Sequence, residues 1–278
     1  MPALDLEAEY NNRARVVNSG EIIARWAEAS AKARAELSSE RDIAYGSMPR
    51  NAYDFYPAQG ASGRAPLVVY IHGGYWQRGD RREYAFVARE LVSRGVNVAL
   101  PSYTLCPDIG IDGIATEIEQ FLAALWTKTK QRPVLVGHSA GGHLAAMMMA
   151  SKKPNGDLPA DLVKAAYGLS GVYDLPPLVP TSLNAALGLD KVAARKLSPM
   201  FGPNPAHACE FVAAVGGDES PEFIRQATDF TAAWSGGPVE IESNIVAGKN
   251  HFTIVDEFCR NGSPMLDRVV AMANSVAT

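Results

Sequence analysis

VLVGHSAGGHL (residues 134–144) decides the fold of this 278-residue chain. An apolar run leads into Gly137-His138-Ser139-Ala140-Gly141, and a run of small and apolar residues follows. The first run is typical of a buried strand and the second of a helix, so Ser139 stands in a sharp strand-to-helix turn. Small neighbours prevent clashes with the flanking strand and helix there. Such a turn exposes the serine hydroxyl at the carboxyl edge of a sheet.

Strands and helices alternate from residue 67 onward. The apolar runs that predict strands are 67–71, 96–101, 133–137, 163–170, 210–217 and 238–246. The segments that predict helices are 82–95, 113–129 and 140–151. Apolar runs separated by helices predict an α/β fold, with a mostly parallel central sheet and helices on both faces. We expect a single domain over residues 1–278, with ligands bound at the carboxyl ends of the strands.

Two segments lie outside this alternation. Residues 1–40 are expected to be an N-terminal helical segment, because apolar residues recur at helical spacing over 20–38. Two short strands at a sheet edge, 42–46 and 52–57, should follow. Residues 174–206 hold six prolines between two core strands. An insertion at the strand ends predicts a lid or a pocket wall, and a plain surface excursion is the alternative.

Composition narrows the function classes. The formal net charge is −4, so the sequence lacks the basic field that attracts nucleic acid or an anionic membrane. No apolar run approaches the roughly 20 residues that span a bilayer. The acidic start MPALDLEAEY does not resemble a secretory signal. We therefore expect a cytoplasmic protein whose partner is a small-molecule substrate, and a homodimer stays open.

The cysteines indicate neither disulfides nor a metal. Cys106, Cys209 and Cys259 are odd in number and far apart. Free thiols in a reducing compartment are the ordinary interpretation of such a set. No other group of His, Cys and Asp has the spacing of metal ligands. We therefore expect no metal and no cofactor.

A second motif follows the strand 67–71, and it reads His72-Gly73-Gly74-Tyr75-Trp76. Two consecutive glycines let the backbone approach a reacting centre and turn its amides inward. Tetrahedral intermediates of acyl transfer need such donors for the developing oxyanion. We expect the amides of Gly73, Gly74 and Ala140 to form this oxyanion hole. A simple turn is the alternative for a glycine pair taken alone.

A serine nucleophile needs a general base, and His251 is the candidate. Among the other histidines, His72 and His138 belong to the two motifs, His143 lies inside a helix and His207 is in the insertion. His251 falls in a loop after the last strand and before the last helices. The chain order Ser, acid, His of this fold class places the base there.

The acid that orients this histidine should follow the strand 210–217. Asp218 and Glu219 are adjacent there, and only one of two neighbouring side chains can face the imidazole. The spacing G-x-x-[DE] from Gly216 favours Glu219, and Asp218 would then cap the next helix. Asp174, after the preceding strand, is a third candidate.

Together these residues resemble the kynurenine formamidase (arylformamidase) branch of the α/β-hydrolase superfamily. The resemblance covers residues 40–260 and rests on HGGYW, GHSAGGHL, SGVYDLPPL and ESPEFIRQ. It implies an α/β-hydrolase fold, an H-G-G-x-W oxyanion segment at 72–76, a nucleophile at Ser139 and a base at His251. The family acid is often an aspartate directly before SPEF, and this chain has Glu219 at that place.

The expected chemistry is acyl transfer through an acyl-enzyme. Ser139, deprotonated by His251, attacks a formyl or acyl carbon, and Glu219 stabilises the imidazolium. One candidate function is a formyl amidase that acts on an aromatic formamide such as N-formylkynurenine. A broad esterase for short acyl groups is the alternative. A binding protein on an inactive hydrolase scaffold is a third interpretation, and the intact triad argues against it.

The substrate pocket is less defined by the sequence. Tyr75, Trp76 and Phe252 flank the motifs and are expected to form an aromatic wall, with core packing as the alternative. The N-terminal YNNRARV, residues 10–16, would cover part of the pocket. The amino-acid end of such a substrate would need a cation or several donors. The residues left open for that role are Arg78, Arg81, Arg82, Asn184 and Lys249.

Overall fold

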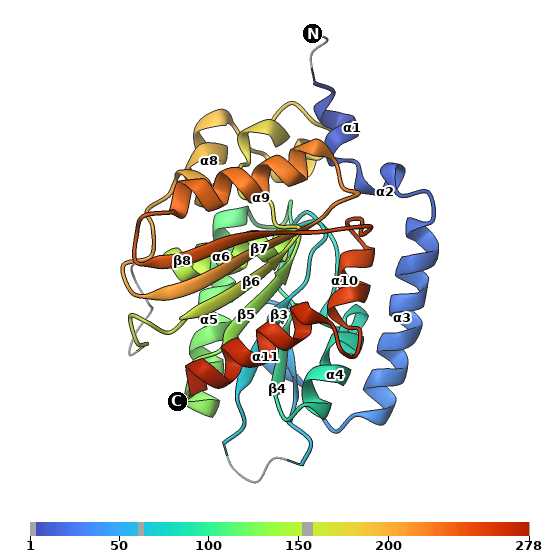
Figure 1. The fold of residues 1–278 in the computed structure, drawn as a ribbon, viewed down its shortest axis with the longest axis vertical. Helices are drawn as coiled ribbons and strands as arrows, with labels where there is room; N and C mark the ends of the chain where they lie inside the picture. Colours follow the sequence, from blue (N-terminus) through green and yellow to red (C-terminus); the bar gives the residue numbers. More distant parts are fainter. Residues whose placement is uncertain (1–3, 61–63, 152–157, 278) are drawn as a thin grey trace.

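The computed structural model describes residues 4–60, 64–151 and 158–277. Its centre is an eight-stranded sheet in the order β1-β2-β4-β3-β5-β6-β7-β8 (Figure 1). The strands are β1 Glu40–Ala44, β2 Ala52–Tyr56, β3 Leu67–Ile71, β4 Asn97–Pro101, β5 Val134–His138, β6 Ala165–Leu169, β7 Cys209–Gly216 and β8 Val239–Val246. β1 and β2 pair antiparallel at one edge, and β3 to β8 run parallel. The predicted mostly parallel sheet is confirmed.

Helices cover both faces of this sheet. The α-helices are α1 Leu6–Tyr10, α2 Asn12–Arg15, α3 Ser19–Glu36, α4 Ala88–Ser93, α5 Ile111–Thr129, α6 Ala140–Ala150, α7 Asn184–Leu187, α8 Lys191–Lys196, α9 Pro221–Trp234, α10 Thr253–Phe258 and α11 Pro264–Ala277. Short 3-10 turns are η1 Arg81–Glu83, η2 Ala85–Val87, η3 Pro176–Leu178 and η4 Pro199–Phe201. The insertion 174–206 thus consists of short helical pieces, as its prolines predict.

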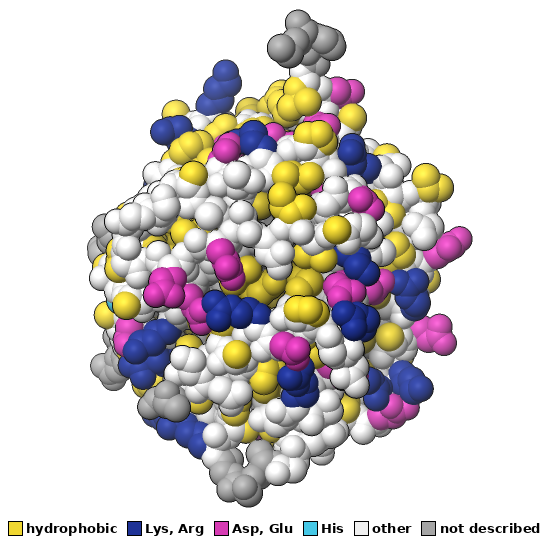
Figure 2. Space-filling view, in the orientation of Figure 1, with side chains coloured by type: hydrophobic (Ala, Val, Ile, Leu, Met, Phe, Trp, Pro, Cys, Tyr) yellow, Lys and Arg dark blue, Asp and Glu magenta, His cyan; other side chains and the backbone are white. Residues whose placement is uncertain are grey.

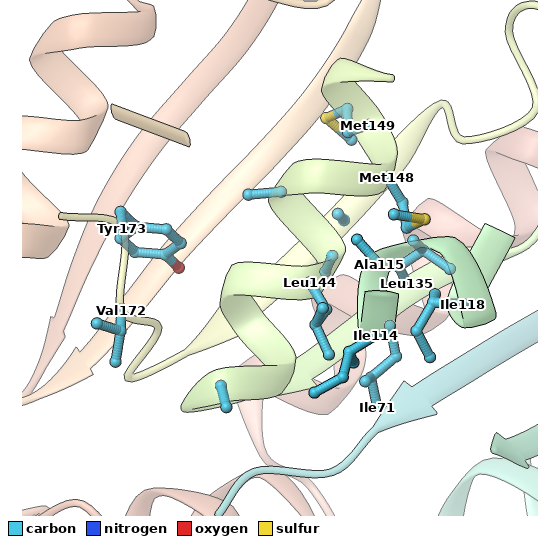
Figure 3. Close-up of a cluster of buried hydrophobic side chains, with 14 of the residues drawn as sticks. Ile71, Ile114, Ala115, Ile118, Leu135, Leu144, Met148, Met149, Val172 and Tyr173 are labelled. Carbon is cyan, nitrogen blue, oxygen red and sulfur yellow. The ribbon is translucent and has the colours of Figure 1, made fainter. Parts of the chain in front are cut away.

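The sheet separates two hydrophobic cores, because alternate side chains of each strand point to opposite faces. Val69 of β3 belongs to the core under α5, α6 and α9, and its neighbour Val68 to the core under α3, α4, α10 and α11. Figure 3 shows Leu144 of α6 close to Ile114 of α5 and Leu135 of β5. Every residue of β3, β5 and β6 is buried, so these strands form a rigid platform for the loops at their carboxyl ends.

One predicted helix is wrong. Residues 82–95 form the turns η1 and η2 and only a short α4 instead of one continuous helix. Ser30 of α3 explains the break, because its hydroxyl donates to the Glu83 carbonyl (2.7 Å) and accepts from the Phe86 amide (3.3 Å). A continuous helix would use these two backbone groups internally. Packing against the N-terminal helix therefore overrides the local helical pattern.

On the face in Figure 2, lysine and arginine side chains are interspersed with aspartate and glutamate. Within the described ranges, no helix combines the length and the apolar character that crossing a membrane requires.

The turn between β5 and α6 is the tightest junction of the fold. Ser139 has φ 55° and ψ −118°, a conformation that is costly for a residue with a side chain. A methyl group added to Gly141 would lie 2.0 Å from the Ile71 carbonyl oxygen, and one added to Gly137 would lie 2.1 Å from the Gly141 carbonyl oxygen. Only glycine lets the helix start this close to β3 and β5.

We expect Gly141→Ala to destabilise the protein, because the new methyl group must displace the backbone of β3 or α6. Overpacking of this kind costs about 1–3 kcal/mol or more. Gly20→Ala is the matched control, since no atom lies within 4 Å of its added Cβ in α3 and alanine favours a helix. Thermal unfolding should show a lower Tm for Gly141→Ala alone. Equal melting temperatures would contradict this account of the turn.

Candidate active site

A cavity of about 470 Å³ opens beside Ser139 at the carboxyl ends of the parallel strands. Its walls include Gly74 and Tyr75 after β3, Ser139 after β5, and His251 and Phe252 after β8. The loops that follow three strands thus bring together residues from distant parts of the sequence. This is the location expected for a ligand site in such a sheet.

His251 and Glu219 form the buried ion-pair geometry that the candidate base and acid require. The His251 Nδ1 lies 2.7 Å from Glu219 Oε2, and both residues are about 95% buried, with exposed fractions of 4% and 5%. Ser139 is 2% exposed and lines the same cavity as His251. Among the described residues no hydrogen bond joins Ser139 Oγ to His251. Such bonds often tighten only when substrate binds.

The loops that carry the acid and the base are in direct backbone contact. The Asp218 amide donates to the Lys249 carbonyl (2.9 Å), and a methyl group on Gly216 would lie 2.2 Å from that same oxygen. The Asn250 side chain accepts from the amides of Phe252 and Thr253, both at 3.0 Å, so the chain turns into α10 directly after His251. These contacts set the imidazole against the carboxylate.

Ser170 is a contact of Glu219 that sequence reasoning missed. Its hydroxyl and the Gly216 amide (2.7 Å) both donate to Glu219 Oε1, while Oε2 faces His251. The Ser170 amide donates to the Ala214 carbonyl (2.7 Å), and its φ is 52°. The signal for this role was its place directly after β6, at the same sheet edge as the strand before Glu219.

The other two candidate acids lie elsewhere. Asp218 is exposed, and the prediction that it caps α9 is wrong, because Ser220 is the N-cap and accepts from the Phe223 amide. Asp174 pairs with Arg225 of α9 at 2.7 Å. Burial raises the pKa of Asp174, and Arg225 acts in the opposite direction. Of the three carboxylates, Glu219 is the one that contacts His251.

His138 holds the backbone of His251. Its Nε2 lies 2.8 Å from the His251 carbonyl oxygen, so the ring donates a proton there. Burial, with a smaller contribution from the neighbouring His251, lowers the pKa of His138 to about 3. His138 is therefore neutral at pH 7 and acts as a fixed donor rather than as a second base.

The glycine-rich loop after β3 lies against Ser139. A methyl group on Gly73 would be 2.9 Å from Ser139 Cβ, and Gly74 lines the cavity. Within the described part of the chain, the amides of Gly73, Gly74 and Ala140 donate to no partner. Free amides on two loops that meet beside Ser139 suit a developing negative charge. The oxyanion hole at these three amides stays a prediction.

His72 and Tyr103 hold this loop in place. The rings stack at 4.4 Å, and the Tyr103 hydroxyl donates to the His72 carbonyl (2.9 Å). The His72 Nδ1 lies 2.9 Å from the Gly73 carbonyl oxygen, and burial lowers the pKa of His72 to about 4. A neutral His72 therefore orients the loop.

The three predicted aromatic wall residues divide into two groups. Tyr75 and Phe252 line the cavity, with Phe252 packed 5.6 Å from the His251 ring. Trp76 does not line it, because its side chain is fully buried and packs edge-on against His143 at 4.9 Å. The placement of Trp76 in the aromatic wall is therefore wrong, and the core alternative holds for this residue.

The N-terminal segment forms a large part of the cavity wall. Tyr10 and Arg13 from the first two helices line it, together with Trp26 of α3. The Tyr75 hydroxyl donates to the Tyr10 carbonyl (2.7 Å), and the Glu7 carboxylate accepts from the Ser182 amide (2.7 Å) and hydroxyl (2.6 Å). The N-terminus is thereby tied both to the loop after β3 and to the insertion.

Of the residues left open for the polar end of a substrate, Arg78 alone lines the cavity. Arg81 is buried against Asp54 (3.0 Å). The remaining candidates make other contacts: Arg82 with Asp80 (2.8 Å), Lys249 with Glu257 (3.0 Å) and Asn184 with the Leu189 carbonyl (2.9 Å). Among the described residues no group of His, Cys, Asp and Glu could hold a metal ion.

We expect Glu219→Gln to lower kcat by about 10⁴-fold, because a neutral amide cannot stabilise the imidazolium and favours the wrong imidazole tautomer. Asp218→Asn is the matched control, since this carboxylate is exposed and makes no contact with His251. Its kcat should stay within about twofold of the wild-type value. Steady-state kinetics of both variants checks the assignment. A collapse in Asp218→Asn with a near-normal Glu219→Gln would reverse it.

Ser170→Ala should lower kcat on the order of tenfold and leave KM nearly unchanged, because one donor to the charged Glu219 is lost. The substitution keeps a Cβ at the same backbone conformation, and the Tm should fall by roughly 2–4 °C because a buried carboxylate loses one of its donors. Ser235→Ala, an exposed serine at the end of α9, serves as the control. A normal kcat in Ser170→Ala would remove this hydroxyl from the positioning of Glu219.

Comparison with known proteins identifies relatives of this chain. The family model BD-FAE matches residues 53–175. Kynurenine formamidases of Salmo salar and Danio rerio are 30% and 29% identical over 83% and 81% of this chain, and over 80% and 79% of their own lengths.

Solved structures extend the likeness to the whole fold. A protein of Silicibacter sp. tm1040, provisionally described as a thioesterase, is 30% identical and superposes with a TM-score of 0.87 over 98% of this chain and 99% of its own. The metagenomic carboxylesterase EstE1 has a TM-score of 0.70 at 18% identity over 93% and 97% of the two chains, and shares the fold. The chain therefore belongs to the kynurenine formamidase family of α/β-hydrolases and is a hydrolase of formamide or ester bonds.

Proposed function

We propose that this protein hydrolyses an aromatic formamide of the N-formylkynurenine type, releasing formate and an aryl amine. The observation that carries the proposal is the meeting of Ser139, the buried His251–Glu219 pair and the free amides after β3 at one cavity. The similarity to kynurenine formamidases over four-fifths of the chain supports the substrate class.

In this proposal His251 takes the Ser139 proton as the serine oxygen attacks the formyl carbon. The tetrahedral oxyanion accepts hydrogen bonds from the amides of Gly73, Gly74 and Ala140. Glu219 stabilises the imidazolium, which then protonates the leaving amine. A water molecule, activated by His251, attacks the formyl-enzyme and releases formate, which regenerates the Ser139 hydroxyl.

The aromatic side chains on the cavity wall support an aromatic leaving group. Tyr75 and Phe252 lie on the walls that adjoin Ser139, and Trp26 adds a third aromatic ring. We assign the insertion 174–206 as a pocket wall within one domain, because Ser182 and Leu183 line the cavity. A broad esterase for short acyl groups would use the same machinery and is the alternative that the experiment below separates.

We also infer a cytoplasmic location. All three cysteines are free thiols, two of them buried, which suits a reducing compartment. Cell fractionation would test this inference.

The test compares kcat/KM for N-formylkynurenine and for p-nitrophenyl acetate with the same purified enzyme. We expect kcat/KM to be at least about tenfold higher for the formamide, because a site built for this substrate binds its leaving group in the transition state. Acyl-transfer machinery alone would give no such preference. A preference for the acetate would favour the esterase.

The serine mechanism has its own test. Ser139→Ala should lose about 10⁶-fold in kcat while keeping the wild-type Tm. Retention of a tenth of the wild-type rate would overturn the assignment of Ser139. So would activity that disappears with a chelator and returns with zinc.

A further inference from the structure

We propose that Arg13 and Arg78 form a carboxylate-binding subsite in the cavity, which selects substrates whose leaving group carries an α-amino-acid end. This inference rests on the proposed acyl transfer at Ser139 and adds the residues that decide which leaving groups are accepted. Sequence reasoning left Arg78 as one of several candidates and did not identify Arg13.

The two arginines reach the cavity from segments far apart in the chain. Arg78 follows the oxyanion loop, and its amide donates to the Gly74 carbonyl (3.1 Å), so the turn that shapes the oxyanion hole also places this residue. Arg13 lies on α2. The Asn12 side chain ties that helix to the Tyr75 hydroxyl (3.3 Å), and the Ser19 hydroxyl donates to the Arg13 carbonyl (3.0 Å).

Both guanidinium groups are free of protein partners. Over residues 4–60, 64–151 and 158–277, neither side chain makes a hydrogen bond or an ion pair, whereas Arg81, three residues after Arg78, is paired with Asp54. A guanidinium presents a planar fork of donors that matches a carboxylate in two parallel hydrogen bonds. Arg13 and Arg78 are exposed residues on the cavity wall, and two such groups without acidic partners suit an anionic ligand that enters from solvent.

The charges of Arg13 and Arg78 act on the same ring. Tyr84 lines the cavity, and burial raises its pKa, with a further contribution from Glu83. The positive charges of Arg13 and Arg78 both act against this rise. Both guanidinium groups therefore face the part of the cavity wall to which Tyr84 belongs.

The acidic residues of the cavity complete the match to an amino acid. Glu7 is already occupied by the Ser182 amide and hydroxyl. Glu83 also lines the cavity, and its carboxylate has no cation paired with it in the described part of the chain. A free carboxylate on the same cavity wall as two free guanidinium groups suits the ammonium and carboxylate groups of a zwitterion.

The test uses two pairs of probes that differ in the anionic end. The formamides are formanilide, which is neutral, and 4-(2-formamidophenyl)-4-oxobutanoate, which carries the carboxylate. The esters are phenyl acetate and 4-(2-acetoxyphenyl)-4-oxobutanoate. Each pair is measured with wild-type enzyme, Arg13→Gln, Arg78→Gln and the double variant. Arg89→Gln is the matched control, because this arginine does not line the cavity and pairs with Glu36 on the surface.

We expect each single variant to lose on the order of tenfold in kcat/KM for the anionic probe, and the double variant more, through KM rather than kcat. Rates for the neutral probes and for Arg89→Gln should stay within about twofold of wild type. Equal losses on neutral and anionic probes, or no loss on either, would overturn the subsite.

The two hypotheses fail separately. If the enzyme cleaves esters but not formamides, the proposed function is wrong and the ester pair still tests the subsite. Binding of 4-oxo-4-phenylbutanoate, measured by calorimetry, needs no turnover, and its Kd should rise on the order of tenfold in each single variant. An unchanged Kd in a variant with the wild-type Tm would also contradict the role of the two arginines.

Discussion

The close backbone packing at the β5–α6 turn is the constraint on which the rest of the site depends. Glycine at positions 137 and 141 lets α6 begin against β3 and β5, and this contact forces Ser139 into a conformation with positive φ. The same packing puts the loop after β3 within contact of Ser139 Cβ. The close packing at Gly137 and Gly141 therefore fixes the position of Ser139 and of the neighbouring loop that carries the free amides.

The position of the Glu219 carboxylate also depends on the central sheet. This carboxylate is buried, and each oxygen has a donor: the Gly216 amide and Ser170 hydroxyl on one side, His251 on the other. A buried carboxylate without such donors would be costly. Because the donors come from β6, β7 and the loop after β8, the parallel order of three neighbouring strands determines the geometry of the base.

Much of this could be predicted from the sequence. The alternation of apolar runs with helical segments, together with the two glycine motifs, was sufficient to predict the fold and the position of Ser139. The spacing from Gly216 favoured Glu219, the carboxylate that contacts His251 in the structure. The Asp218 cap failed for a local reason, because Ser220 takes that position. Two other failures have one cause, which is contact between segments far apart in the chain. Ser30 interrupts the helix expected at 82–95 by bonding its backbone. Trp76 packs against His143 in the core instead of lining the cavity. No local pattern carries these contacts.

The N-terminal segment is the clearest case of such a contact with a functional consequence. The residues before α3 do not follow a strand of the sheet. The rule that ligands bind at the carboxyl ends of strands therefore does not predict that these residues line the cavity. They reach the cavity because Tyr10 donates from its hydroxyl to Glu222 (2.7 Å), three residues after Glu219, and because Glu7 binds the insertion. The candidate catalytic groups thus follow strands of the sheet, while part of the cavity wall comes from outside it. The segment also contacts the candidate acid, because Arg15 donates to the Glu219 carbonyl (3.5 Å). Its cavity-lining residues are therefore the ones at which a change would alter the wall and leave this contact in place.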